Sequence, residues 1–256
     1  MYDAHGFLGN NPQWVAWGVP TPLNEESWLQ IMESIGLDGA LVMPPGLGNR
    51  DDFKSDMESI ALAMERHPGR FHGLCRVKPR RGQAALDDIR YWVEERGFCG
   101  LKINTADQVY SLDDRRLLDP VIELADRLGI LVLCHTGDFF SSTCTPGMVA
   151  DLAVDFPGTT FVIGHMGHPG WHGGLIEAMR RAPNTVTTTG AVFRLDVIMP
   201  VVGEIGAGRI LMGSHGPYAP VAMAPLMIKD GLPGVSDDDK QAILHSNFVR
   251  VLGLDS

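Results

Sequence analysis

Four histidines occupy the same kind of position, at the end of a short segment typical of a β-strand. They are His5 in DAHGFLG, His135 in LVLCHTGD, His165 in FVIGHMGH and His215 in ILMGSHGP. An imidazole titrates at about pH 6.5, so it can exchange protons close to neutrality, and in its neutral form it binds zinc. A single histidine after an apolar segment is more often structural than catalytic. Four on separate strands favour an active site, built either around a metal ion or from general acids and bases.

Polar residues lie near the ends of three further predicted strands. Lys102 and Asn104 belong to GLKIN, Arg76 to GLCRVKP, and Arg194 follows TTTGAV. Lysine and arginine bind carboxylates, and arginine can do so through two parallel hydrogen bonds. We therefore expect these four residues to contact an anionic substrate. Ion pairs within the barrel or on its surface are the alternative.

Two other groups could complete such a site. Asp138 follows the fifth predicted strand and is the nearest carboxylate that could act as a base, although an aspartate there can also cap a helix or a turn. Phe7, Trp14 and Trp17 lie in or near the first loop. Their aromatic faces could cover a planar substrate or pack against the rim of the fold.

The elements that must position these residues alternate between short apolar strands and longer amphipathic helices. Uninterrupted apolar strands are typical of a parallel sheet buried on both faces. The predicted strands span residues 2–5, 39–43, 71–77, 100–103, 131–135, 160–165, 185–188 and 210–213. The predicted helices span residues 24–35, 52–66, 83–96, 114–128, 146–155, 174–181, 195–205 and 236–252. Eight strand–helix units predict an α/β fold, a single (β/α)8 TIM barrel, whose active site lies at the carboxyl ends of the strands.

An open doubly wound sheet is the alternative fold. It often carries a glycine-rich phosphate-binding turn after its first strand, and DAHGFLGNN is not such a turn. Two long irregular stretches, 6–23 and 215–233, are expected to be active-site loops. Because 256 residues is the usual size of one barrel, we expect one domain spanning residues 1–256.

The overall composition narrows the choice of ligand. A formal charge of -10 repels nucleic acid and anionic lipid, so we expect a small-molecule substrate and neither of those partners. The four cysteines show no CxxC spacing, which suits a reducing compartment. No segment offers the roughly 20 apolar residues that cross a bilayer, and the first residues do not resemble a signal peptide. We therefore expect a cytoplasmic protein, and barrel helices offer surfaces for a homodimer.

Several segments, in this order, resemble the amidohydrolase-related TIM-barrel proteins, in particular the branch that contains aminocarboxymuconate semialdehyde decarboxylase. They are DAHGFLG, GFCGLKIN, YSLDDRRLLDPVIELADRLGILVLCHTGD, FVIGHMG and ILMGSHGP. The resemblance implies a metal-dependent enzyme. The first strand would supply two ligands from an HxH pair, the fifth strand a histidine and the eighth an aspartate. The histidine of the sixth strand, here His165, would be catalytic.

This chain departs from that pattern at two positions. Phe7 stands where the second histidine of the pair is expected, and His215 stands where the aspartate is expected. Phenylalanine cannot bind a metal, and an imidazole in place of a carboxylate removes both a negative charge and the usual base. His5, His135 and His215 would still offer three nitrogen ligands, enough for a catalytic zinc site. The alternative is a metal-free site, as in relatives that resemble lactonases.

The sequence thus leads to three functional hypotheses. The first is an amidohydrolase-like enzyme that hydrolyses a small carboxylated or cyclic substrate (an amide, lactone or ester), with His165, Asp138 and His215 in acid–base roles. The second is a nonoxidative decarboxylase or another carbon–carbon lyase. The third is a metal-free binding or scaffold protein that has lost catalysis, a hypothesis motivated by Phe7 and His215.

Overall fold

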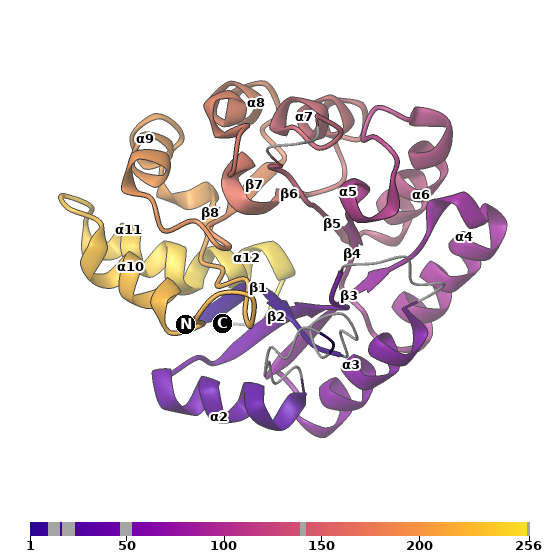
Figure 1. Ribbon diagram of the computed structural model, residues 1–256, viewed down its shortest axis with the longest axis horizontal. Helices are drawn as coiled ribbons and strands as arrows, with labels where there is room; N and C mark the ends of the chain where they lie inside the picture. Colours follow the sequence, from indigo (N-terminus) through magenta and orange to yellow (C-terminus); the bar gives the residue numbers. More distant parts are fainter. Residues whose placement is uncertain (10–15, 17–23, 47–52, 139–141, 255–256) are drawn as a thin grey trace.

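Eight parallel strands form one barrel in the computed structural model, which describes residues 1–9, 16, 24–46, 53–138 and 142–254. The strands follow each other around the barrel in chain order, and the helices lie outside them (Figure 1). The ring closes where β1 meets the segment after β8, through a parallel bridge between Gly6 and Gly216 and a hydrogen bond from the His215 amide to the His5 carbonyl. The predicted (β/α)8 barrel is therefore confirmed.

The strands begin where the sequence predicts them, within one residue, but several end elsewhere. They are β1 (Tyr2–Phe7), β2 (Gly39–Met43), β3 (Phe71–Arg76), β4 (Gly100–Ile103), β5 (Leu131–Cys134), β6 (Phe161–Ile163), β7 (Thr185–Thr188) and β8 (Ile210–Leu211). The predicted end of the sixth strand at His165 is wrong, because His165 and Met166 have φ angles of 61° and 54°, which extended backbone cannot adopt. The site therefore begins where the regular strand geometry stops.

The helices also match the predicted pattern, with two additions. They are α2 (Glu25–Ile35), α3 (Lys54–Arg66), α4 (Gln83–Arg90), α5 (Thr105–Gln108), α6 (Arg115–Leu128), α7 (Pro146–Asp155), α8 (Leu175–Arg181), α9 (Leu195–Ile205), α10 (Met223–Gly231), α11 (Asp237–Gln241) and α12 (Asn247–Leu252). A π-helical turn, Tyr91–Glu95, extends α4, and another, Ala242–Ser246, joins α11 to α12. The sequence did not predict α5 or α10.

The prediction of an irregular loop over 215–233 is wrong for its second half. Helix α10 forms there, and Pro225 is compatible with it because it lies in the first turn, where a missing amide proton costs no intrahelical hydrogen bond. The predicted loop at 6–23 is wrong at its start, because Gly6 and Phe7 belong to β1, and most of its remaining residues lie outside the described ranges. Within those ranges, every helix is too short or too polar to span a bilayer.

Strand alternation divides the apolar residues into two cores. In β5, Val132 and Cys134 pack outward against the helices, whereas Leu131 and Leu133 point into the barrel. Because side chains alternate along a strand, the next inward position after Leu133 is His135. The same alternation turns Lys102 of β4 and Arg76 of β3 toward the carboxyl end of the barrel interior. The other end is filled by Phe248 of α12, which stacks on Tyr2 at 4.5 Å.

Candidate functional site

Three imidazoles converge at the carboxyl end of the barrel. His5 comes from β1, His165 from the turn after β6 and His215 from the loop after β8. One potential ligand atom from each lies within 4.8 Å of those of the other two. The ring centroids are 4.5 Å apart for His5 and His165, 4.6 Å for His165 and His215, and 5.0 Å for His5 and His215. We refer to these three residues as the histidine cluster.

The position of His5 depends on an irregularity in β1 and on glycines around it. The pairing of β1 with β2 shifts between Asp3 and Gly6, and such a bulge re-aims the side chain inside it. The Asp3 carboxylate accepts the His5 amide at 2.9 Å, which fixes the irregular backbone. A Cβ atom on Gly190 would lie only 2.9 Å from Nδ1 of His5, and one on Gly213 would lie 2.9 Å from its Cβ. The imidazole therefore fills space that these glycines leave open.

His165 is oriented by two hydrogen bonds and an unusual backbone. Its amide donates to Oγ1 of Thr188 at 3.4 Å, and its Nδ1 lies 2.8 Å from the carbonyl oxygen of Gly190. A carbonyl only accepts, so Nδ1 carries the proton and Nε2 presents a lone pair. Nδ1 of His5 lies 3.1 Å from Oγ1 of Thr188 as well. The Nε2 atoms of His5 and His165 are both buried and have no hydrogen-bond partner among the described residues.

All four strand-end imidazoles are held neutral. Burial, reinforced by repulsion from neighbouring imidazoles and from Lys102, lowers the pKa values of His5, His135 and His215 well below the usual range. Burial and then the charge of Lys102 lower the pKa of His165 to about 3. A neutral imidazole can bind a metal or accept a proton, whereas an imidazolium can do neither.

The opposite wall of the site carries charged side chains from β3, β4 and α5. Nη2 of Arg76 lies 2.8 Å from Oδ2 of Asp107, which also accepts Nδ2 of Asn104 at 2.9 Å. Lys102 is buried beside them, and its Nζ has no hydrogen-bond partner among the described residues. Burial and the charge of Arg76 lower the pKa of Lys102 to about 7. We refer to Arg76, Lys102, Asn104 and Asp107 as the cationic wall.

A pocket of about 170 Å³ lies between the histidine cluster and the cationic wall. Its described lining residues are Phe7, Gly46, Lys102, Asn104, Asp107, His135, His215 and Tyr218. Phe7 meets His215 edge-on with ring centroids 5.0 Å apart, and Tyr218 at 4.7 Å. The side chains of Phe7, His215 and Tyr218 thus form an aromatic wall beside the imidazoles.

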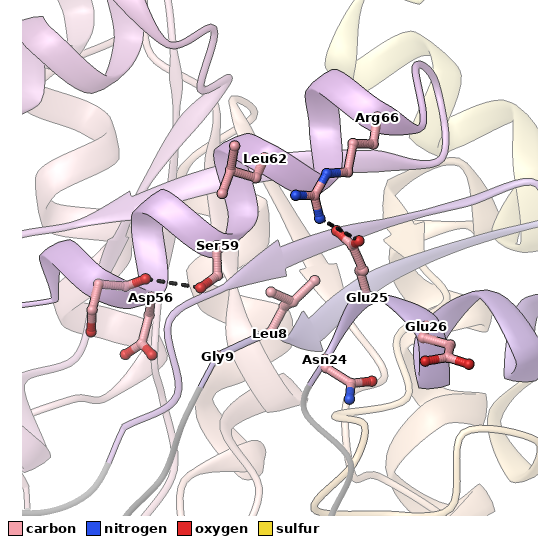
Figure 2. Close-up of a pocket in the computed structure, with 10 residues that line it drawn as sticks. Leu8, Gly9, Asn24, Glu25, Glu26, Asp56, Ser59, Leu62 and Arg66 are labelled. Atoms are coloured by element: carbon pink, nitrogen blue, oxygen red, sulfur yellow. Dashed lines mark hydrogen bonds and ion pairs between the residues drawn. The ribbon is translucent and has the colours of Figure 1, made fainter.

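A larger hollow of about 600 Å³ lies beside the starts of α2 and α3 (Figure 2). Its described lining is mainly acidic and aliphatic, and its one arginine, Arg66, pairs with Glu25 at 2.7 Å. None of these residues is a histidine or a lysine. The hollow therefore lacks the imidazoles and the lysine of the smaller pocket, and its arginine is already paired, so the smaller pocket is the better candidate site.

The structure brings most of the predicted site residues together but not all of them. The four strand-end histidines, Lys102, Asn104 and Phe7 meet at the pocket or directly behind it, and Arg76 lies behind Asp107. Asp138 is half-buried outside the pocket lining, with its carbonyl accepting Nε1 of Trp171. Arg194 is exposed and pairs with Asp196, because the chain leaves the barrel mouth there to begin α9. Trp14 and Trp17 lie outside the described residues.

Sequence reasoning missed three members of the site. Asp107 lies in the unpredicted helix α5, Tyr218 follows His215 by three residues, and Thr188 ends β7. Tyr218 could have been found as an aromatic residue in a loop that follows a strand-end histidine. The roles of Thr188 and Asp107 depend on contacts across the barrel, which strand patterns do not reveal.

The match to known sequences covers most of the barrel. The sequence model of the amidohydrolase family matches residues 35–254. The chain belongs to the amidohydrolase family. No curated protein matches it by sequence.

Solved structures of decarboxylases share the fold. The 2,6-dihydroxybenzoate decarboxylase from Rhizobium is 17% identical, with a TM-score of 0.73, and the match covers 100% of this chain and 99% of that one. The 5-carboxyvanillate decarboxylase from Sphingomonas paucimobilis is 18% identical, with a TM-score of 0.76 and coverage of 100% and 99%. The dihydroxybenzoic acid decarboxylase from Polaromonas, solved with manganese and 2-nitroresorcinol, is 18% identical, with a TM-score of 0.75 and coverage of 100% and 97%. At this identity the likeness establishes the fold of the amidohydrolase barrel and not its reaction.

The described residues are compatible with a divalent metal. The Nε2 atoms of His5 and His165 are buried and have no hydrogen-bond partner among the described residues, and that of His165 presents a lone pair of the kind a metal ion binds. Asp107 is the only carboxylate among the described residues that line the pocket, and Arg76 and Asn104 already engage it. Any metal held here would therefore be bound mainly through nitrogen.

Proposed function

We propose that this amidohydrolase-family protein catalyses the nonoxidative decarboxylation of a small carboxylated ring compound. The observation that carries the proposal is the buried side-chain nitrogen of Lys102, which lines the pocket and has no hydrogen-bond partner among the described residues. A buried cation without a partner is costly, and a substrate carboxylate would pair with it. The decarboxylase activity of structurally similar proteins supports the same choice.

The size and lining of the pocket support a single ring. Its volume of about 170 Å³ is close to that of a cavity known to hold benzene, about 150 Å³. The aromatic wall offers ring faces and edges against which a planar substrate can pack. A substrate with one ring and one carboxyl group would place the ring against Phe7 and Tyr218 and the carboxylate toward Lys102.

The reaction breaks the bond between the ring carbon and the carboxyl carbon, releases carbon dioxide and leaves a proton on the ring carbon. The arriving carboxylate raises the proton affinity of Lys102 and of nearby imidazoles, because its negative charge stabilises their charged forms. His135 lines the pocket and is placed to hold the proton taken up with the substrate. A divalent metal bound by the imidazoles would supply positive charge that stabilises negative charge developing on the substrate.

Hydrolysis, the first hypothesis from the sequence, remains a prediction, and its chemical requirements can be compared with the residues of the same pocket. It requires a base to activate water, for which the family resemblance implies a carboxylate at the position of His215. The pocket carboxylate, Asp107, accepts hydrogen bonds from Arg76 and Asn104 and is therefore poorly placed to accept a proton from water. Decarboxylation needs a proton donor instead, a role that suits imidazoles and a lysine.

The proposal can be tested with ring carboxylic acids labelled with ¹³C in the carboxyl group. Protein stripped with chelator and reloaded with zinc or manganese would be incubated with hydroxybenzoates and related acids, while released ¹³CO₂ is followed by mass spectrometry. We expect release from at least one acid. Turnover of lactones or amides without ¹³CO₂ release would favour hydrolysis and contradict the proposal. Tight ligand binding without turnover of either class would favour the scaffold hypothesis.

A further inference from the structure

We infer that His5, His165 and His215 form an all-imidazole metal site that prefers zinc to manganese, and that His135 is not a ligand. The family resemblance assigns His135 to the metal and a catalytic role to His165. The geometry points to the reverse, since the three ligand atoms that converge within 4.8 Å belong to the histidine cluster. The inference concerns metal binding and does not rest on the proposed reaction.

The backbone explains why His165 can reach the cluster. Its φ angle of 61° lies in the left-handed region, which is unfavourable for a residue with a side chain and persists only where surrounding contacts impose it. The contacts that impose it here are those of its amide with Thr188 and of its Nδ1 with Gly190. His215 has a similar φ angle of 64°. The ring centroids of His165 and His215 lie 4.5 Å and 5.0 Å from that of His5.

His135 follows a different course. Its amide donates to the carbonyl of Ile103 at 2.8 Å, so its backbone continues the parallel pairing of β5 with β4. Its ring lies 4.8 Å from that of His165 and lines the substrate pocket, but it does not belong to the converging group. An imidazole in this position is available for proton transfer.

Thr188 fixes the ring orientation of His5 toward the shared point. Its Oγ1 lies 3.1 Å from Nδ1 of His5, so that Nε2 faces the cluster. Metal-binding histidines usually donate their other ring nitrogen to an oxygen atom, which fixes both the tautomer and the ring. Thr188 supplies that oxygen for His5, and the carbonyl of Gly190 supplies it for His165. Two of the three proposed ligands thus have an oxygen atom beside Nδ1, and the carbonyl at His165 fixes the tautomer that a bound metal requires.

The chemistry of the donors predicts which metal binds. Neutral imidazoles suit zinc, copper and nickel, whereas manganese and magnesium favour carboxylate and water oxygens. The cluster contains no carboxylate, and the nearby charge of Lys102 opposes any cation. Two nitrogens bound to one zinc ion lie at most about 4.2 Å apart, so the cluster would contract slightly on binding.

Titration calorimetry of the chelator-stripped full chain with zinc chloride and manganese chloride tests the inference. We expect one zinc per chain, bound at least 100-fold more tightly than manganese. His165→Ala should weaken zinc binding at least 100-fold, and the matched variant His135→Ala less than tenfold. Loss of zinc binding in His135→Ala but not in His165→Ala would overturn the ligand assignment. Absence of zinc binding by the unmodified chain, or equal affinity for manganese, would overturn the site or its preference.

A measurement on the unmodified chain removes any dependence on how the variants fold. Long-range ¹H–¹⁵N spectra of histidine-labelled protein report which imidazole nitrogens bind a metal, because coordination shifts the nitrogen resonance. With one equivalent of zinc, we expect one ring nitrogen each of His5, His165 and His215 to shift and those of His135 to keep the chemical shifts of an unligated ring. Coordination shifts at His135 in place of His165 would refute the inference.

Discussion

The cationic wall and the histidine cluster are built in different ways from the same barrel. The cationic wall follows regular strand alternation, since Arg76 and Lys102 occupy inward positions above Leu74 and Gly100, and Arg76 lies beside Lys102 in the strand register. The histidine cluster departs from strand geometry, through the shift in β1 and the left-handed residues at His165 and His215. Regular strands thus place charges at the pocket, whereas irregular backbone aims the imidazoles at one point.

The cationic wall and the histidine cluster also differ in their electrostatics. In the cationic wall, Asp107 accepts hydrogen bonds from Arg76 and Asn104, whereas Lys102 lines the pocket and its Nζ has no hydrogen-bond partner among the described residues. In the histidine cluster, the buried Nε2 atoms of His5 and His165 have no partner among the described residues. The cationic wall is therefore arranged to bind a carboxylate, and the histidine cluster to bind a metal.

The largest effect is expected on stability in mild acid, in the metal-stripped protein. The folded-state pKa values of His5, His135, His165 and His215 are lowered, that of His165 to about 3, so the unfolded chain binds more protons below about pH 6.5. Stability should therefore fall as the pH drops through this window, by about 1 kcal/mol per pH unit for each histidine near pH 6. Urea unfolding between pH 5 and pH 7.5 measures the slope. If the change of unfolding free energy with pH corresponds to the uptake of less than one proton on unfolding, the four imidazoles are not all neutral in the folded protein.

Much of this arrangement could be predicted from sequence, for a physical reason. Apolar strands of regular length locate the barrel and its carboxyl end, so the strand-end positions of His5, His135 and Lys102 follow directly. The turn at His165 and the shift in β1 could not be predicted, because they depend on partners such as Thr188 and Asp3 that approach across the barrel. Which histidines share a metal is decided by those contacts.

A large effect is also expected from removing the cation that would pair with the substrate. Lys102→Met keeps much of the side-chain volume but not the charge, and we expect kcat/KM for a ring carboxylic acid to fall by roughly 100- to 1000-fold. Zinc affinity should stay the same or rise, since a positive charge near the cluster is lost. The exposed Lys229 provides the matched control, Lys229→Met, with unchanged kinetics. Undiminished activity in Lys102→Met would break the proposed division between the walls.

A smaller effect is expected from crowding His5. In Gly190→Ala the new Cβ would lie 2.9 Å from Nδ1 of His5, so the imidazole must move away from the cluster. Displacing a ligand by a fraction of an ångström should weaken zinc binding, by close to 100-fold in a range of roughly 10- to 100-fold. Gly203→Ala, which meets nothing within 4 Å, is the control. Calorimetry that finds equal zinc affinity in both variants would show that the position of His5 is unimportant.

The smallest effect is expected at Thr188. Thr188→Val preserves shape but removes the oxygen that orients His5, and loss of such a partner should weaken zinc binding by about tenfold. Thr187→Val is matched, because the Thr187 hydroxyl donates to the carbonyl of Ile163 and not to a histidine. We expect zinc affinity to change in the first variant only. A similar loss in both would indicate a general effect on β7.

The most direct test of both walls is a crystal structure grown with zinc and a ring carboxylic acid, with data collected at the zinc absorption edge. We expect one anomalous peak, from a zinc ion bound by nitrogens of His5, His165 and His215, and a carboxylate paired with Nζ of Lys102. A peak bound by His135 without His165, or a carboxylate turned away from Lys102, would contradict this expectation.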